Sequence, residues 1–507
     1  MHLTLLDLIV VIGYLAGLSL MGVYFSRRQT SEESYFLGNR RMPALLVGVS
    51  VMATLISTLS YLSSPGEMIR NGTGYFTSML SFIVVVPVVN FIIIPALMKL
   101  PVTTVYEYFE KRFNYGVRGI GAVVFIVMRL TWVGLIIYTA SLAVAKMTGW
   151  DIQVVILVVG LITTFYTTAG GMPAVIWSDF IQGMLLIGGA LFIPVYIALQ
   201  TGTGPGIWWE TFSQAGRTSV PVFSLDPTVR ITIVGIIIES IFWHICTHSA
   251  DQVAAQRYLS TSSVKEARKS VWVSAIFTVT LLLLLMVVGL AIFNFYFQQS
   301  DLPIRQFQEH IAADADNKLP EFIARELPTG LSGLLLAALL AAAMSSLSSG
   351  INSISSVVVT DFVERLGSGG AKTKTLTLAM MIAAAAGLSG VAMALGVNQI
   401  MEAKSEWNLV DMVERINHLF VAPLGVLFLA GVLLRRVGTT AVILGFMAGV
   451  CTSVCVSFSK EIFHLETGLS FMWIMPLSFV VGMAVSFVTG FFLPRPSKEQ
   501  LESLSTK

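Results

Sequence analysis

Long apolar runs separated by short polar segments make up most of this chain. A helix needs about 20 apolar residues to cross the hydrocarbon core of a membrane, and by that measure the pattern predicts thirteen spans. Their approximate limits are residues 4–25, 43–68, 74–98, 118–146, 151–168, 174–200, 230–252, 266–297, 329–361, 373–396, 408–434, 438–460 and 469–493. Because backbone inside a bilayer must satisfy its own hydrogen bonds, we expect an all-α polytopic membrane protein with about 13 transmembrane helices.

The composition supports this class. Hydrophobic residues make up 55% of the 507 positions and charged residues 12%, and the mean hydropathy is +0.80, which together exclude a soluble globular protein. The net charge of +2 gives no indication of a nucleic-acid partner. The three cysteines lie in apolar stretches, so neither a disulfide framework nor a cysteine metal site is expected. Arg27 and Arg28 follow the first apolar run, so we expect that span to remain uncleaved.

Basic residues are concentrated in alternate loops. About two thirds of the Lys and Arg residues fall in one set of segments, namely 27–41, 99–118, 257–269, 365–374, 435–436 and the C-terminal tail. The side richer in basic residues is cytoplasmic in most membrane proteins. The N-terminus is therefore predicted outside and the C-terminus inside, in a cell (inner) membrane. No soluble domain and no obligate protein partner are expected beside the lipid bilayer.

Residues 341–356, AAAMSSLSSGINSISS, place seven serines and an asparagine inside an apolar span. Five of these polar residues recur every three or four positions: Ser345, Ser348, Ser349, Asn352 and Ser356. That spacing puts them on one face of a helix. Lipid offers hydroxyls no partner, so this face must meet protein, water or an ion. Two interpretations are open at this point, close packing between helices and the lining of a cation site.

Two other spans are interrupted or polar. Hydroxyl side chains fill residues 53–64, and Pro65 and Gly66 then weaken helix continuity. Five spans later, residues 238–252 read IESIFWHICTHSADQ and carry two histidines and two carboxylates. Interrupted spans at matching places in two halves indicate a midplane binding site in secondary transporters. The alternatives are an ordinary kink and a position for Asp251 in the headgroup region.

The stretch 166–183, YTTAGGMPAVIWSDFIQG, closely resembles the signature of the sodium/solute symporter family. Residues 103–113 (TTVYEYFEKRF), the tripeptide Gln256-Arg257-Tyr258 and the serine stretch match the family in the expected order. The resemblance runs from the first span to the thirteenth. It implies coupling of inward sodium movement to the uptake of a small solute by alternating access.

The resemblance also implies the LeuT-type fold, a core of two inverted five-helix repeats. The first repeat would be residues 43–200 and the second 230–434, with 201–229 as an extracellular loop between them. Residues 1–42 would add an N-terminal span and a cytoplasmic loop. Residues 435–507 would add two C-terminal spans and a cytoplasmic tail.

The sodium sites are carried over from the family by position. The first would use carbonyl oxygens and hydroxyls of five residues, Ala53, Ile56, Ala342, Ser345 and Ser346. A second site, present in some members, would use Asp179 with Ser345, Ser348 and Ser349. Independently of the resemblance, a hard monovalent cation favours neutral oxygens over sulfur or imidazole, and a helix break frees carbonyls to point at an ion. One sodium ion is therefore expected, and a second is plausible.

Residues of the solute pocket are less well defined. Polar and aromatic candidates on the core helices are Ser57, Thr58, Ser60, Tyr75, Met79, Trp132, His248, Asp251, Asn417 and His418. In members that carry sialic acid, an arginine on the third core helix grips a carboxylate, but the matching position here is Trp132, with Arg129 one turn earlier. Packing and interface anchoring are the alternatives for the aromatic residues. The candidates indicate a small polar organic solute without identifying it.

The leading hypothesis is therefore a sodium-coupled symporter. A proton-coupled carrier of the same fold, with Asp179, Asp251 and the histidines as relay groups, is the alternative, although protons need no shell of hydroxyls. An enzyme is not expected, because the sequence has no paired catalytic carboxylates, nucleophile elbow or H-E-x-x-H motif.

Overall fold

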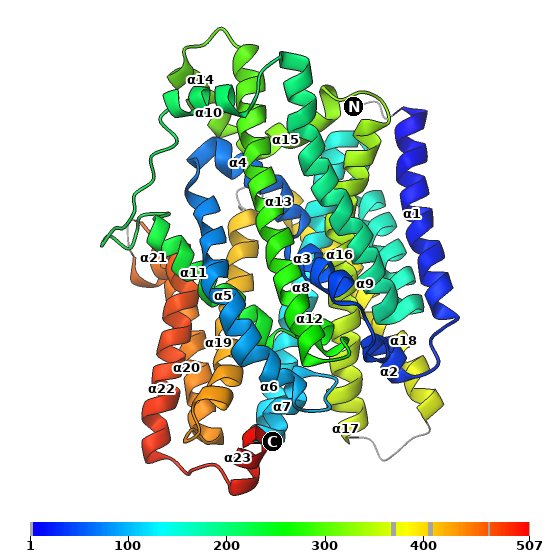
Figure 1. The fold of residues 1–507 in the computed structure, drawn as a ribbon, viewed down its shortest axis with the longest axis vertical. Coiled ribbons are helices and arrows are strands. Elements are labelled where there is room, and N and C mark those ends of the chain that lie inside the picture. The colour runs from blue at the N-terminus through cyan, green and yellow to red at the C-terminus, as the bar shows by residue number, and fades with distance from the viewer. Residues whose placement is uncertain (1–3, 367–371, 404–408, 465–466, 506–507) are drawn as a thin grey trace.

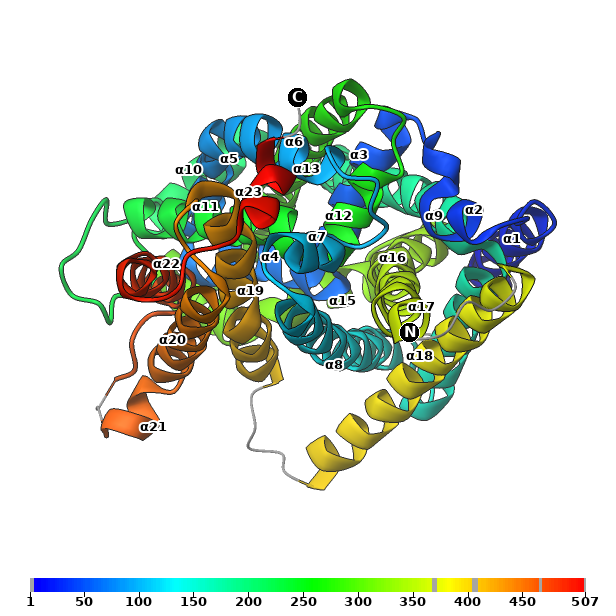
Figure 2. The same ribbon diagram turned by 90° about the horizontal axis from the view of Figure 1, so that it is seen from below.

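The computed structural model describes residues 4–366, 372–403, 409–464 and 467–505. Within these ranges the chain is helical and contains no β-strand. Ten of the described helices are long and apolar enough to cross a membrane, or eleven if one bent pair counts as a span. The helices stand roughly parallel in one bundle, with α1 at one edge and α20 and α22 at the opposite edge (Figures 1 and 2). The predicted all-α class is confirmed.

The long helices follow the predicted spans closely. They are α1 (Leu5–Ser26), α3 (Ala44–Leu55) with α4 (Thr58–Asn71), the run from η2 to α6 (Gly74–Met98), α8 (Tyr115–Thr148), α9 (Ile152–Thr201), α11 (Ile233–Ala250) with α12 (Gln252–Leu259), α13 (Val264–Gln298), α16 (Leu331–Val357), α18 (Lys372–Ala403), α19 (Leu409–Leu433), α20 (Thr439–Ser457) and α22 (Ile474–Phe492). Most of their boundaries fall within a few residues of the predicted limits. The apolar pattern therefore located the spans correctly.

Short helices occupy the two ends of the bundle. One end carries α2 (Glu32–Leu37), α7 (Val105–Arg112), α17 (Glu364–Leu366) and α23 (Lys498–Ser505). The other carries α10 (Pro205–Gln214), α14 (Ile304–Ala313) and α15 (Ala315–Arg325) (Figure 1). The N- and C-termini lie at opposite ends of the molecule (Figure 1), which agrees with an odd number of spans.

Helix α9 contains both of the spans predicted at 151–168 and 174–200. Its 50 residues would extend about 75 Å at the usual rise per residue, more than twice the hydrocarbon thickness. The helix breaks direction at Gly171, where φ is 59° and ψ is −159°. A Cβ atom there would lie 2.6 Å from the Tyr35 ring, so glycine is required. The predicted loop between the two spans is therefore a kink, and the total of thirteen spans stays a prediction.

Both interrupted spans contain a backbone break, but the first break lies at residues 56–57, and α4 continues as a helix through Pro65 and Gly66. Helix α3 ends at Leu55, and Ile56 adopts an extended conformation with φ −97° and ψ 102°. The Ser57 hydroxyl then accepts a hydrogen bond from the Ser60 amide and starts α4, at an angle of 61° to α3. Helices α11 and α12 are separated in the same way by Asp251, with φ −83° and ψ 117°. Its carboxylate accepts from the amide of Val253 at 2.9 Å. Each break frees backbone groups in the middle of a span.

Helix α1 contacts the helix that carries the serine row. Asp7 accepts hydrogen bonds from the amides of Gly330 at 2.7 Å and Gly333 at 2.8 Å, at the N-terminus of α16. Helix α16 has no cap from its own side chains. A Cβ atom on Gly333 would lie 2.6 Å from the Asp7 Cα, so the two backbones touch. Asp7 therefore caps α16 from another helix.

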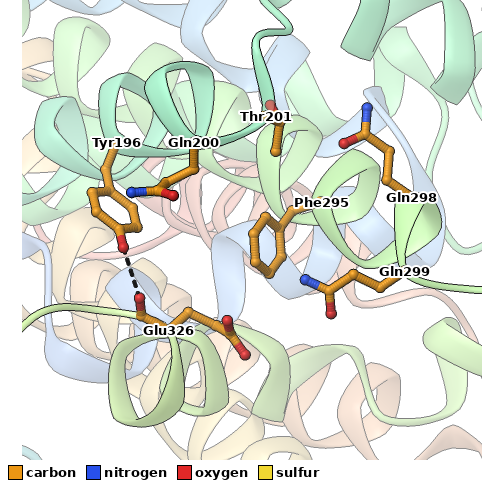
Figure 3. A pocket seen from close by; sticks show the side chains of 7 residues that line it. All are labelled: Tyr196, Gln200, Thr201, Phe295, Gln298, Gln299 and Glu326. Carbon is orange, nitrogen blue, oxygen red and sulfur yellow. Dashed lines mark hydrogen bonds between the residues drawn. The ribbon is translucent and has the colours of Figure 1, made fainter.

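A cavity of about 430 Å³ lies between the ends of α9 and α13 (Figure 3). Its lining residues are Tyr196, Gln200, Thr201, Phe295, Gln298, Gln299 and Glu326. None of them was a predicted site residue, and none belongs to the two interrupted pairs, α3 with α4 and α11 with α12. This cavity therefore does not define the transport site.

Candidate functional site

Four of the five groups predicted for the first sodium site lie together at the α3 break. The Ser345 hydroxyl donates to the carbonyl oxygens of Ala53 at 2.9 Å and Ala342 at 3.1 Å. The Ser346 hydroxyl donates to the carbonyl of Thr54 at 3.0 Å. The fifth group, Ile56, is the extended residue at the break itself. The structure thus brings the serine row of α16 against the free backbone of α3.

The local sequence explains why these oxygens are available. In a continuous helix the carbonyls of Ala53 and Thr54 would accept from amides four residues later, but α3 ends at Leu55. On the facing helix, every residue from Leu335 to Val357 is buried, so its hydroxyls meet protein rather than lipid. Neutral carbonyl and hydroxyl oxygens are suitable ligands for a hard monovalent cation. The arrangement can therefore replace part of a sodium hydration shell.

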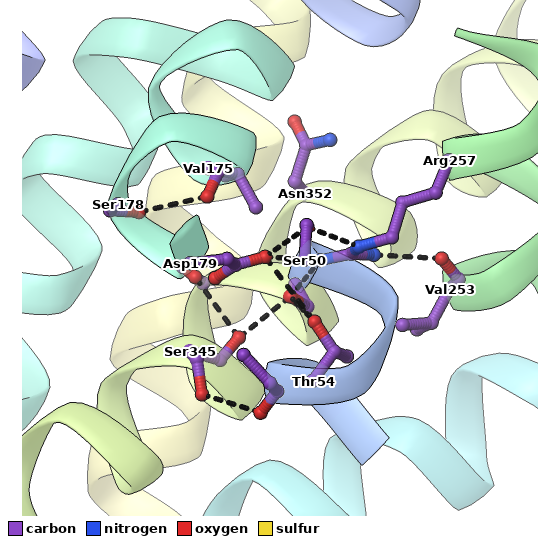
Figure 4. A network of polar contacts seen from close by, with 12 residues as sticks. Ser50, Thr54, Val175, Ser178, Asp179, Val253, Arg257, Ser345 and Asn352 are labelled. Carbon is purple, nitrogen blue, oxygen red and sulfur yellow. Dashed lines mark hydrogen bonds and ion pairs between the residues drawn. The ribbon is translucent and has the colours of Figure 1, made fainter. Parts of the chain in front are cut away.

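The predicted second site contains a carboxylate that is fully buried. Asp179, on α9, has no exposed surface, and its Oδ2 atom accepts from the Ser50 hydroxyl at 2.5 Å and from Arg257 Nη2 at 2.8 Å (Figure 4). The Ser349 hydroxyl contacts Thr54 at 2.9 Å and also Arg257. Of the predicted residues, Ser349 therefore lies in the network around Asp179.

Ser348 is part of the same helical turn but makes a different contact. Its hydroxyl donates to the carbonyl of Ser345 at 3.1 Å, and the Ser349 hydroxyl donates to that carbonyl at 2.6 Å. Hydroxyls bonded back to their own helix keep lone pairs free to accept a second contact. The serine row is thus continuous from the first predicted site to Asp179.

Three residues of this network were not predicted as site residues: Ser50, Thr54 and Arg257. Ser50 and Thr54 are four positions apart on α3 and so share a helical face, a spacing that the sequence does contain. Arg257 is buried without exposed surface and was noted only as part of the tripeptide match. Its role depends on partners far away in the sequence, which no local pattern reveals.

The solute candidates near the second break are already engaged with protein groups. Arg129 on α8 forms a buried ion pair with Asp251. This pair gives Arg129 a protein partner and places Asp251 inside the protein rather than among headgroups. His248 Nδ1 lies 2.6 Å from the Tyr258 hydroxyl, and the His248 ring stacks on His244. Asp251 and His248 are therefore both paired, whereas His244 Nδ1 and Thr247 Oγ1 at the same break are buried without a hydrogen-bond partner among the described residues.

The remaining candidates are distributed around the first break and α19. Thr58 is buried and donates to the Leu339 carbonyl at 3.1 Å, while Ser57 and Ser60 form the cap of α4. Tyr75, Met79 and Trp132 are half-buried. His418 Nε2 lies 3.5 Å from a carboxylate oxygen of Glu239, and the side chain of Asn417 lies outside the described residues. As a set, these ten candidates stay a prediction.

A shell of carbonyls and hydroxyls at a broken span, in a bundle of apolar helices, defines a cation-coupled secondary transporter. The family model of the sodium:solute symporter family matches residues 35–449. The chain belongs to this family, as its signature indicated. It is accordingly a sodium-coupled symporter of a small solute in a multi-pass membrane fold, and not an enzyme.

Relatives resemble the chain over most of its length. The sodium/sialic acid symporter SiaT of Proteus mirabilis is 30% identical over 458 residues, covering 89% of this chain and 90% of that protein. The sodium/sialic acid symporter NanT of Aliivibrio fischeri is 27% identical over 505 residues, or 98% and 94% of the two chains. Human sodium-coupled monocarboxylate transporter 1 is 28% identical over 464 residues, or 90% and 74%.

Solved structures show the same architecture. The substrate-bound, outward-open state of a Na⁺-coupled sialic acid symporter matches with a TM-score of 0.85 and 27% identity, over 98% of this chain and 99% of that chain. Mhp1, a nucleobase-cation-symport-1 family transporter, matches with a TM-score of 0.54 and 13% identity, over 92% and 97%. The second match concerns the fold alone. Together they confirm the LeuT-type fold that the sequence resemblance implied.

Proposed function

We propose that this symporter carries a small polar organic acid together with sodium, which binds at the α3 break. The observation that carries the sodium part is the oxygen shell formed by α3 and α16, in which Ser345 and Ser346 face the free carbonyls of Ala53 and Thr54. The relatives named for sialic acid and for monocarboxylates transport carboxylic acids, which supports an acid as the solute class.

The proposal includes a second sodium ion at Asp179. The Oδ1 atom of Asp179 is buried and has no hydrogen-bond partner among the described residues. An unpartnered carboxylate oxygen in the interior is costly, and a cation is the group that would offset this cost. Ser348 and Ser349, on the neighbouring turn of α16, would complete the site with neutral oxygens.

The orientation follows from the charge pattern and the position of the termini. We place the protein in the cell (inner) membrane, with the end that carries α7, α17 and the C-terminus facing the cytoplasm, because this end holds most of the basic residues. Glu110 there lies 2.7 Å from Arg118 and 2.8 Å from Arg365. The hydrogen bond from Arg365 holds the pKa of Glu110 below its usual range. These ion pairs join α7, α8 and α17 across that face.

Uptake by proteoliposomes tests the coupling ion. A sodium gradient should drive accumulation of a labelled acid, with N-acetylneuraminate and lactate as the probes, and replacing sodium by choline should abolish it. Full uptake in choline that instead follows an imposed pH gradient would support the proton-coupled carrier.

The solute class is tested by competition, since the uncharged amide of the transported acid should compete poorly. Equal competition by acid and amide would contradict an acid as the substrate.

A further inference from the structure

Arg257 connects the short helix α12 to three other helices. Its guanidinium donates to Ser50 on α3, to the Val253 carbonyl, to Asp179 on α9 and to Ser349 on α16 (Figure 4). A buried guanidinium is tolerated only when its charge is paired and its N–H groups are bonded. Arg257 meets this condition only while α12 stays against all three helices. The contact set therefore depends on the position of α12.

The two oxygens of the Asp179 carboxylate have different surroundings. Oδ2 accepts from Arg257 at 2.8 Å, from Ser50 at 2.5 Å and from Thr54 at 3.3 Å. Oδ1 is buried and unpartnered within the described part of the chain. A guanidinium and a sodium ion can therefore contact one carboxylate from its two sides. The single negative charge would then be shared between two cations.

Helix α12 lies between the break at Asp251 and the basic loop that precedes α13, on the side of the break that we place toward the cytoplasm. It begins at the break after Asp251, and all eight of its residues are buried. Other side chains also fasten it, since Gln252 donates to the Thr103 carbonyl at 2.9 Å and Gln256 donates to the Phe36 carbonyl at 2.8 Å. Arg257 differs from these contacts because its main partner is the proposed sodium ligand. Only this contact can respond directly to the ion.

We propose that Arg257 is a latch on α12 whose hold on Asp179 is weakened when sodium binds to the Oδ1 side of the same carboxylate. The proposal rests on the second sodium site proposed above. Two positive charges repel each other across a buried carboxylate, where screening by water is weak. Linkage is reciprocal, so Arg257 must lower the affinity for sodium by the same factor by which sodium weakens the latch. Sodium arrival would thus favour release of α12 and opening toward the cytoplasm.

The substitution Arg257→Gln tests the latch, because it removes the positive charge that pairs with Asp179. We expect the sodium affinity to rise about tenfold, within the usual range of coupling between two sites. We also expect uptake of solute without sodium, because α12 is no longer held closed. Arg257→Lys keeps the charge and should stay near the parent in both measurements. Sodium titration of thermal stability reports the affinity, and uptake in choline buffer reports the leak.

Arg112→Gln is the matched control. Arg112 is also fully buried, but among the described residues its guanidinium donates to backbone carbonyls alone, those of Gly431, Leu434 and Val437. Removing it takes away a buried cation that does not touch Asp179, so the sodium affinity should not change. If Arg112→Gln raised the sodium affinity as much as Arg257→Gln does, a general effect of removing positive charge would explain the result, and the latch proposal would be rejected.

A double variant covers the case in which Arg257→Gln leaves Asp179 as an unpaired buried charge and prevents folding. Asp179→Asn with Arg257→Gln removes both charges, and it should leak solute without sodium. Unchanged sodium affinity and no leak in Arg257→Gln would overturn the latch. If Asp179→Asn alone still lowered the Hill coefficient for sodium, the second site would stand without the latch. If only a variant at Ser346 changed the sodium response, the second sodium site and the latch would both be refuted, and the first sodium site alone would remain.

Discussion

Replacing Ser346 by alanine tests the first sodium site directly. The side chain is 2% exposed, and its hydroxyl donates to the Thr54 carbonyl at 3.0 Å, which leaves the oxygen lone pairs available to an ion. A contact between a charge and such a group contributes about 1.5–3 kcal/mol. Four ligands remain and water can enter the space of the hydroxyl, so we expect the lower part, about 1.5–2 kcal/mol. The sodium concentration for half-maximal uptake should rise about 10–30-fold.

The assay is uptake in proteoliposomes at saturating solute, with sodium varied against choline at constant ionic strength. Ser355→Ala is the matched control, since Ser355 is fully buried on the same helix and donates to the Ala379 carbonyl at 2.7 Å. Ser355→Ala also removes one buried serine hydroxyl, but from the face of α16 that meets α18. The sodium dependence of uptake by this variant should therefore match that of the parent. A sodium dependence that is unchanged in Ser346→Ala, or changed equally in both variants, would refute the proposed site.

Three further outcomes follow from other parts of the structure. Asp7→Ala removes the cap of α16 and the carboxylate of the capping box that Thr4 begins on α1. The free energy of unfolding should therefore fall by about 1–4 kcal/mol, visible as a lower thermal midpoint, and an unchanged midpoint would rule out these contacts as stabilising. Burial and the neighbouring Glu364 raise the pKa of Glu32 from 4.5 to about 8, so the folded state holds this proton more tightly than the unfolded chain. Stability should therefore fall as pH rises through that window, and Glu32→Gln should flatten the decline in midpoints measured across it; equal declines would contradict the assignment. Gly171→Ala should abolish the monodisperse peak in size-exclusion chromatography, because φ is +59° and a Cβ atom would lie 2.6 Å from Tyr35. Gly188→Ala is the control and should keep the peak, because nothing lies within 4 Å of a Cβ atom there.

The spans and their interruptions could be predicted because they depend on local sequence. An apolar run of sufficient length has few alternatives to a membrane helix, and the break at residues 56–57 was expected from the hydroxyl-rich stretch that contains it. Helical spacing also predicted which serines share a face, and the structure places Ser345 and Ser349 of that face against α3, whereas Asn352 meets α9 and Ser356 meets α12. In each case the residues that determine the feature are neighbours in the chain.

The interactions that complete the site could not be predicted in this way. Arg257 meets Asp179 across 78 positions and Ser50 across 207, and Arg129 meets Asp251 across 122. A charged residue in an apolar segment predicts that a partner exists, but not which of several carboxylates it is. Gly171 shows a related limit, since the sequence placed a boundary between spans near residues 168–174 but did not reveal that Tyr35 packs against the break there.

The cap that Asp7 provides for α16 has a consequence for how the protein is made. Asp7 and Gly330 are 323 residues apart, so at ordinary rates of synthesis about 15 to 65 s pass before the partner amides emerge. Helix α9 is completed within that interval, and its Gln182 donates to the Tyr14 hydroxyl at 3.0 Å. We therefore expect α1 and α9 to pair before the serine-bearing helix docks. A chain that stops before residue 330 would keep the bonds from Thr4 to Asp7 Oδ2 but would leave Oδ1 without the amides of α16, and this difference distinguishes unfinished molecules from finished ones.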